Sequence, residues 1–237
     1  MSTSSKRQER VWVRKQVRLF DGLSEDDAAE IAQVATPIDL PKDSLLFAPY
    51  DSVEKLYLLK KGRIKLYKAA DDGKEVTIDF LQPGDVLGNL SLVGDTPLGV
   101  FAEAVEDVRV WAVPRAQLQQ LVQRKPHIAM LLIQAMSERV EHLEAQVEDL
   151  VFLPVPARVA SALLRLAAEH GRVSPRGTLI DLRLTHQDIA NVVGATRETV
   201  TNILNALREA GLIEIEHKRV LIPDCERLAQ QVATSQK

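Results

Sequence analysis

The chain has little cysteine and no long apolar run. Cys225 is the only cysteine in 237 residues, so the chain can form neither an internal disulfide nor a set of thiolate ligands. This excludes an iron–sulfur cofactor. No apolar run approaches the roughly 20 residues of a membrane-spanning helix, and residues 1–22 are basic without the apolar segment of a secretory signal. We therefore expect a cytoplasmic protein with no membrane partner.

Histidine is also scarce, with five residues in the chain and none between positions 37 and 113. A cupin-type metalloenzyme, a distant alternative, needs His and Glu ligands on facing strands. The sequence offers no such set, so we predict no metal site and no enzyme. His127 and His142 could be considered as haem ligands, but lone histidines on helix surfaces are seldom ligands, and we predict no haem.

Charge is unevenly distributed along the chain. The net charge is −3. From residue 154 onward we count 11 Lys+Arg against 9 Asp+Glu, a net +2, whereas residues 1–153 have 19 against 24, a net −5. The mild basicity of the C-terminal part permits nucleic-acid binding but does not establish it. Residues 1–22 are predicted to form a basic solvated arm, or alternatively a supplementary DNA contact.

Residues 184–211 have the pattern of a helix-turn-helix motif. Thr185 with Asp188 is a helix N-terminal signature, and Gly194 can end that helix in a left-handed conformation. Thr196 then caps a second helix, whose apolar positions recur at helical spacing. The residues expected to face inward are Ile189, Ala190, Val193, Ala195, Val200, Ile203, Leu204 and Leu207.

The second helix is predicted to enter the major groove of DNA. Its exposed face begins with Thr196, and the predicted base-reading residues are Arg197, Glu198, Thr201 and Asn202. Arginine can bond to guanine, glutamate can accept from cytosine, and asparagine can pair with adenine. A hairpin follows over residues 212–222, and Lys218 and Arg219 at its basic tip are predicted to contact phosphates. An ordinary helical hairpin with a solvated polar face is the alternative.

Upstream, residues 37–113 change to a period of two, which is typical of strands. Apolar residues alternate with polar ones at Leu56 and Leu58, at Ile64 and Leu66, at Val76, Ile78 and Phe80, and at Val108 and Val110. Turn signals at Gly62, at Gly73 and at Pro83-Gly84-Asp85 separate these runs. The pattern predicts a small antiparallel β-roll, which either encloses an effector pocket or is a filled scaffold.

Pro126 opens a long predicted helix that runs to about Leu150. Its apolar residues are spaced 3, 4, 3, 4, 3, the spacing of a coiled-coil seam. Arg139 and Glu144 flank this seam. A parallel homodimer is predicted, with the alternative that the helix packs on its own β-roll. The predicted dimer-interface residues are Ile133, Met136, Val140, Leu143, Val147 and Leu150. Pro154 and Pro156 interrupt the helix and predict a hinge.

The sequence therefore predicts an α+β chain of four parts. A basic arm (1–22) precedes an antiparallel β-roll that resembles a cyclic-nucleotide-binding domain (23–125). A dimerisation helix (126–153) and a winged helix-turn-helix (154–237) follow. This order, together with Thr196-Arg197-Glu198-Thr199-Val200 and the turns at Gly62, Gly73, Pro83-Gly84-Asp85 and Gly88, resembles the catabolite activator (CRP/FNR) family of bacterial transcription regulators.

The resemblance implies a homodimer that binds double-stranded DNA at a palindromic operator and recruits RNA polymerase as an activator. It also implies phosphate contacts, which fall on Thr185, His186, Thr196, Thr199 and Lys218. Asn202 stands where cyclic-AMP-responsive members generally carry a further base-reading arginine, so we expect an operator that shares only their G/C core.

The candidate effector stretch departs from the family pattern. Its residues are Gly88, Asn89, Leu90, Ser91, Leu98 and Gly99, and they lack the acid and the arginine that hold the ribose and phosphate of cyclic AMP. A buried phosphate without a cation would cost several kcal/mol. Leu143 and Glu144 also replace the small hydroxyl residues that contact adenine. We predict a regulator without a cyclic AMP requirement or cofactor. The alternative is gating by a cyclic nucleotide or another small effector.

Overall fold

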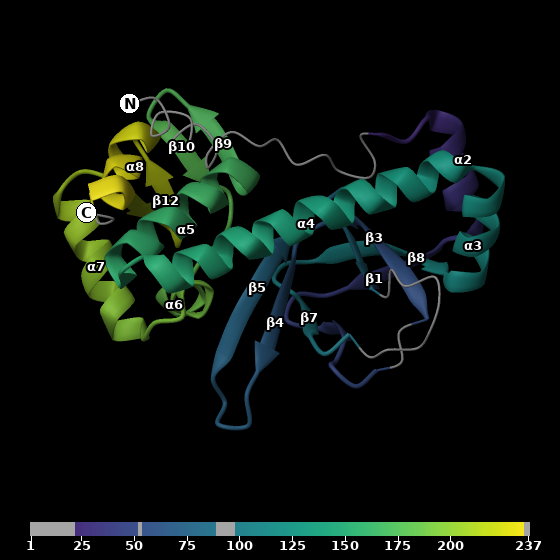
Figure 1. Ribbon diagram of the computed structural model, residues 1–237, viewed down its shortest axis with the longest axis horizontal. Helices are drawn as coiled ribbons and strands as arrows, with labels where there is room; N and C mark the ends of the chain where they lie inside the picture. Colours follow the sequence, from purple (N-terminus) through teal and green to yellow (C-terminus); the bar gives the residue numbers. More distant parts are fainter. Residues whose placement is uncertain (1–21, 52–53, 89–97, 235–237) are drawn as a thin grey trace. The chain divides into compact units, whose positions relative to one another are not determined.

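The computed structural model describes residues 22–51, 54–88 and 98–234 (Figure 1). The chain divides into two compact units, of which one extends to His142 and the other begins at Leu143. The first contains antiparallel sheets and the second contains the helix-turn-helix, which confirms the predicted α+β fold class. Within the described part of the chain, no helix is long and apolar enough to cross a membrane.

The N-terminal unit is a β-roll of two four-stranded antiparallel sheets. The strand orders are β1-β8-β3-β6 and β2-β7-β4-β5. The strands are β1 (Thr36–Leu40), β2 (Leu45–Phe47), β3 (Lys55–Lys61), β4 (Ile64–Ala69), β5 (Glu75–Leu81), β6 (Val86–Gly88), β7 (Phe101–Ala104) and β8 (Val108–Pro114).

Two apolar clusters flank the first sheet. One lies between the sheets and includes Tyr57 and Leu59 of β3. The other includes Leu56 and Leu58 and packs under α2 (Glu25–Val34), α3 (Arg115–Arg124) and the first turns of α4 (Pro126–Phe152). Figure 1 shows these helices at one end of the roll. The predicted apolar/polar alternation of β3 is therefore wrong, because a strand between two cores is apolar on both faces.

A bulge changes the predicted orientation of β5. Leu66 pairs with Asp79 but the next residue, Tyr67, pairs with Thr77, so Ile78 is an extra residue in β5. One extra residue reverses the faces of the residues beyond it. Thr77 is buried at 2% exposure, whereas Val76, predicted to face inward, is 51% exposed.

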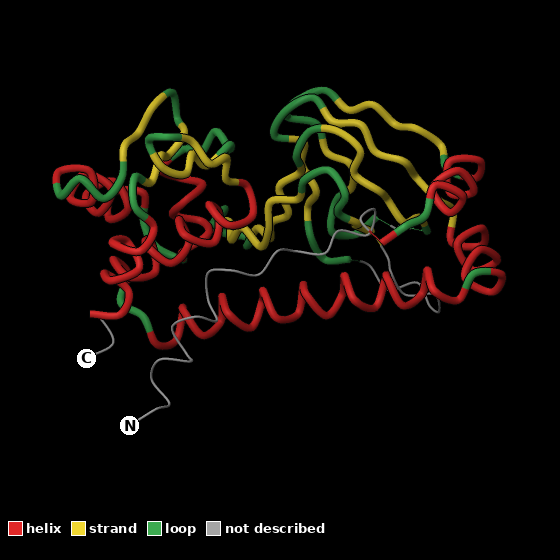
Figure 2. Tube along the Cα trace, turned by 90° about the horizontal axis from the view of Figure 1, so that it is seen from above, coloured by secondary structure: helices red, strands yellow, loops and turns green. Residues whose placement is uncertain are grey.

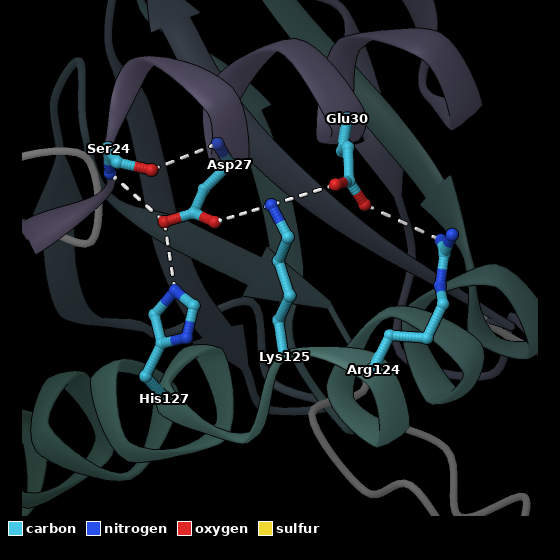
Figure 3. Close-up of polar contacts among 6 residues, drawn as sticks. All are labelled: Ser24, Asp27, Glu30, Arg124, Lys125 and His127. Carbon is cyan, nitrogen blue, oxygen red and sulfur yellow. Dashed lines mark hydrogen bonds and ion pairs between the residues drawn. The ribbon is translucent and has the colours of Figure 1, made fainter.

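A polar cluster joins α2 to the start of α4 (Figure 3). Ser24 and Asp27 form a reciprocal capping box at the start of α2. The buried Asp27 carboxylate also lies 2.9 Å from Lys125 Nζ and 2.9 Å from His127 Nε2. Lys125 bridges to Glu30 at 2.8 Å. The Lys125 ammonium, followed by His127 and Ser24, holds the pKa of Asp27 well below its usual range.

Helix α4 leaves its predicted seam uncovered in the single chain. The six seam residues are between 36% and 58% exposed, whereas Ile128 and Leu132 near the start of α4 are buried against the roll. The helix continues to Phe152, two residues beyond the predicted end. Its seam from Leu143 onward belongs to the C-terminal unit.

The C-terminal unit contains α5 (Val155–His170), α6 (His186–Val193), α7 (Arg197–Glu209) and α8 (Cys225–Thr234) around one antiparallel sheet. The sheet order is β11-β12-β10-β9. Its strands are β9 (Gly171–Ser174), β10 (Gly177–Ile180), β11 (Glu214–Glu216) and β12 (Arg219–Ile222). Figure 2 shows these short strands beside the helices. Helix α8 has no counterpart among the elements predicted from the sequence. Pro154 lies inside this unit, not between the two units.

Candidate nucleic-acid interface

The helix-turn-helix begins with the predicted cap. The Thr185 hydroxyl accepts from the Asp188 N–H at 3.1 Å, and the Asp188 carboxylate accepts from the Thr185 N–H at 2.8 Å. Helix α6 ends at Gly194 with φ 63° and ψ 46°, a left-handed conformation that favours glycine. A Cβ at Gly194 would lie 3.3 Å from Leu150 Cδ2. The left-handed turn therefore favours glycine, and a Cβ would also press on the Leu150 side chain.

Helix α7 is held by the expected apolar contacts. Val200 and Leu204 are fully buried, as are Ile189 and Ala190 of α6. Ala195 and Ile203 are only half-buried. At the N-terminus, the Thr196 hydroxyl accepts from the Thr199 N–H at 3.2 Å. The arrangement leaves Arg197, Glu198 and Asn202 exposed on one end of the helix, which is the end that reads bases in such motifs.

Thr201 differs from the other predicted base readers because its hydroxyl is already engaged. It donates to the Arg197 carbonyl at 2.8 Å and lies 2.9 Å from His186 Nδ1. Since the hydroxyl has one proton, it must accept from His186, which places the imidazole proton on Nδ1. Thr201 can then offer DNA one further lone pair or its methyl group, which suits contact with a thymine methyl. His186 retains only Nε2 for its predicted phosphate contact.

The wing tip is a two-residue turn between β11 and β12. Glu216 pairs with Arg219 as the last rung, so His217 and Lys218 alone form the loop. Both have positive φ, 50° and 65°, as in the type I′ turn that suits two-residue hairpins. The Lys218 carbonyl accepts from the Leu184 N–H at 2.8 Å. This bond brings exposed Lys218 close to Thr185, another predicted phosphate contact.

Arg219 occupies a different environment from Lys218. Its guanidinium lies 3.1 Å from the buried carboxylate of Asp181, which also pairs with Arg172 at 2.6 Å. Because a buried carboxylate needs cationic partners, Arg219 contributes first to the stability of the wing sheet. Of these two predicted phosphate contacts, the exposed Lys218 is therefore better placed to reach a phosphate than Arg219.

The candidate effector stretch is only partly described. Asn89, Leu90 and Ser91 lie outside the described residues. Gly88 has φ 107°, and a Cβ there would lie 2.5 Å from the Lys55 carbonyl, so close packing against β3 explains this glycine. Leu98 packs on the interior cluster, and the Gly99 N–H donates to the Pro49 carbonyl at 3.2 Å.

A cluster of apolar side chains from both sheets packs inside the roll, and it includes Leu59 of β3 and Ile64 of β4. Lys65 is the one buried lysine among the residues that the structure describes. Its neighbours Ile64 and Leu66 face the interior, so alternation along β4 points Lys65 to the opposite face. There it pairs with Glu75 at 2.9 Å.

The same two domains are found in known proteins. Residues 37–125 match the family model of the cyclic nucleotide-binding domain, and residues 157–231 match that of the Crp-like helix-turn-helix domain. The chain is 32% identical over 213 residues to the CRP-like cAMP-activated global transcriptional regulator of Mycobacterium tuberculosis, across 90% of this chain and 95% of that protein. It is 37% identical over 188 residues to the global nitrogen regulator of Synechococcus elongatus, across 78% and 85%.

A solved structure supports the same fold. A CooA mutant from Carboxydothermus hydrogenoformans has a TM-score of 0.76 at 24% identity, across 95% of this chain and 99% of that chain. A cyclic-nucleotide-binding-like roll with a winged helix-turn-helix defines a DNA-binding transcription regulator. The chain belongs to the CRP family of these regulators, which confirms the resemblance seen in its sequence.

Proposed function

We propose that the protein acts as a homodimer on a palindromic operator and binds it without a cyclic AMP requirement. The dimer is supported by the exposed heptad seam of α4, because six large apolar side chains at coiled-coil spacing favour burial against a second copy. Two-fold symmetry of the protein would then match two-fold symmetry of the DNA. We further propose a cytoplasmic activator that recruits RNA polymerase and has no catalytic activity, metal or haem.

The observation that carries cyclic AMP independence is the sequence of the candidate effector stretch, in which Leu98 and Gly99 occupy the place of the arginine and serine of cyclic-AMP-binding members. A cyclic nucleotide brings a phosphate charge, which needs a cation or strong donors when it leaves water. Leu98 and Gly99 supply no cation, and the buried lysine Lys65 is paired with Glu75. An activating effector that raises the DNA-binding conformation of a regulator from about 1% to 99% of molecules must also bind that conformation more tightly than the resting one, by roughly 5.5 kcal/mol. A nucleotide without a phosphate partner is a poor source of that preference.

Gating by a cyclic nucleotide is the second candidate. It is favoured by the match of residues 37–125 to a cyclic nucleotide-binding domain and by the relative named as cAMP-activated.

One experiment separates the two candidates. Operator duplexes are selected from a randomised DNA pool by the protein without nucleotide, and their affinity is measured with and without millimolar cyclic AMP. We expect an inverted repeat to be selected and its affinity to change less than about tenfold, or ~1.4 kcal/mol. A larger increase would favour the gated candidate, and failure to select any repeat would contradict the symmetric dimer.

A further inference from the structure

Three side chains connect the last turns of α4 to α5 across the proline break. Asp149 of α4 accepts a hydrogen bond from the Ser161 hydroxyl at 2.6 Å. The Arg165 guanidinium forms an ion pair with the same carboxylate and donates to the Ser161 hydroxyl at 3.2 Å. Ser161 is buried, and the side chains of Asp149 and Arg165 are 20% and 13% exposed. We call Asp149, Ser161 and Arg165 the clasp.

The backbone itself holds this junction weakly. The Leu153 N–H makes the last helical bond of α4, to the Asp149 carbonyl, and the Arg158 N–H makes an early bond of α5, to the Pro154 carbonyl. Pro154 and Pro156 have no N–H, and the backbone hydrogen bonds of the described residues include none that connects α4 directly to α5 at the break. The angle between the helices therefore depends on side-chain contacts, of which the clasp is charge-assisted and mostly shielded from water.

The helix-turn-helix is attached to the same junction. Arg158 of α5 donates from Nη1 to the Val193 carbonyl at the end of α6, at 2.9 Å. Leu150, which follows Asp149 and is a seam residue, lies against Gly194 in the turn. Contacts of α4 with α5, and of α5 with α6, thus connect the seam residues Leu143, Val147 and Leu150 to the DNA-binding motif within one compact unit.

We propose that Asp149 is a positioning residue for DNA recognition. The clasp fixes the angle between the seam of α4 and helix α5, and through α5 it fixes the orientation of the recognition helix α7. This inference rests on the proposed homodimer. In such a dimer the two recognition helices must be about 34 Å apart to enter successive major grooves. An angular change at the break would move both helices away from that spacing, although each motif would remain folded.

The single cysteine provides a direct measurement of this geometry. Cys225 begins α8, which packs on α5, so a nitroxide on Cys225 reports the position of α5 in each protomer. We expect pulsed electron–electron double resonance on the labelled wild-type dimer to give one narrow distribution of distances between the two nitroxides. Asp149→Ala should broaden the distribution by about twofold or more, because the junction then samples several angles.

The controls separate positioning from general stability. Glu148→Ala removes the neighbouring exposed carboxylate and should leave the distribution narrow. Ser161→Ala removes one contact of the clasp and should give an intermediate width. The double variant D149R/R165D restores an ion pair with reversed polarity and should narrow the distribution again. Dimer mass is measured for each variant, so that broadening in an intact dimer is attributed to the junction.

DNA binding gives the second readout. On the inverted repeat selected by the wild type, Asp149→Ala should lose about tenfold or more in affinity, as expected for a charge-assisted hydrogen-bonded pair. Its affinity for a duplex with one half-site should be unchanged. A narrow distribution and unchanged operator affinity in Asp149→Ala would overturn the positioning role alone. Absence of any dipolar signal from the wild type would overturn the homodimer and, with it, this inference.

Discussion

Substitution of Arg197 gives the most direct test of base reading. It lies in the first turn of α7 with its side chain in solvent, and a bidentate arginine–guanine contact is worth about 1–3 kcal/mol of discrimination. We expect Arg197→Ala to lose that amount on the selected operator and to keep its affinity for unrelated DNA. Competition binding at fixed salt measures both. An equal loss on all sequences would show that Arg197 contacts a phosphate.

Lys218 combines a predicted DNA contact with an unfavourable backbone conformation. Its φ of 65° costs a residue with a side chain about 1–2 kcal/mol, a cost that glycine does not have. We expect Lys218→Gly and Lys218→Ala to weaken binding to all DNA sequences alike and to reduce the salt slope by about one. Only Lys218→Gly should also raise the free energy of unfolding, by about 1 kcal/mol relative to Lys218→Ala. Equal stabilities would argue against strain at the wing tip.

Asp27 should control the acid stability of the N-terminal unit. Its pKa is lowered in the folded protein from a usual 3.8, mainly by Lys125 and then by His127. A carboxyl with a lowered folded pKa stabilises the fold fully above its unfolded pKa, and this stabilisation is lost as the pH falls below that value. We expect Asp27→Asn to be less stable than wild type near pH 7 and less sensitive to acid below about pH 4.

Denaturant unfolding between pH 3 and 7 measures this difference. Glu25, an exposed acid in the same first turn, provides the matched control, and Glu25→Gln should follow the wild-type curve. Parallel curves for wild type and Asp27→Asn would contradict the assigned role. The sequence could not predict this role of Asp27, because Lys125 and His127 lie far along the chain and reach it only after α2 packs beside α4.

At the scale of elements, local signals predicted the helices better than the strands. Thr185, Gly194 and Thr196 act within one turn of themselves, so their caps could be predicted from sequence and are present in the structure. The face of β5 on which Val76 lies could not be predicted from sequence, because it depends on a bulge in the pairing of β5 with β4. Arg219 was assigned to the wing tip, but its partner Asp181 comes from a distant segment.

The sequence predicts that the seam of α4 packs against the same helix of a second copy, which a single chain does not contain. Leu143 lies in the middle of this seam and is 36% exposed. We expect Leu143→Asp to dissociate the dimer at micromolar concentration, because an unpaired charge would be buried between the helices. Phe152→Asp is the control, since it places the same charge on the same helix but off the heptad positions. Sedimentation velocity measures both, and a dimeric Leu143→Asp would contradict the seam.

At the scale of the whole molecule, cyclic AMP provides a test of the β-roll that needs no DNA. A ligand that binds only the folded protein, at 100 times its dissociation constant, stabilises it by about 2.7 kcal/mol. The candidate effector stretch has Leu98 and Gly99 in place of an arginine and a serine, and Lys65, the one buried lysine among the described residues, is paired with Glu75. We therefore expect millimolar cyclic AMP to leave the thermal unfolding midpoint unchanged.

The outcome also identifies the kind of regulator when it is combined with operator affinity. An unchanged midpoint and an unchanged affinity are the results expected for the proposed cyclic-AMP-independent regulator. A raised midpoint with unchanged affinity would mean that the roll binds the nucleotide equally well in the DNA-competent and resting states. A ligand with equal affinity for two states does not shift the equilibrium between them. A raised midpoint together with a tenfold or larger increase in affinity (~1.4 kcal/mol) would contradict cyclic AMP independence. The nucleotide would then have to find its phosphate partner among residues other than the interior cluster.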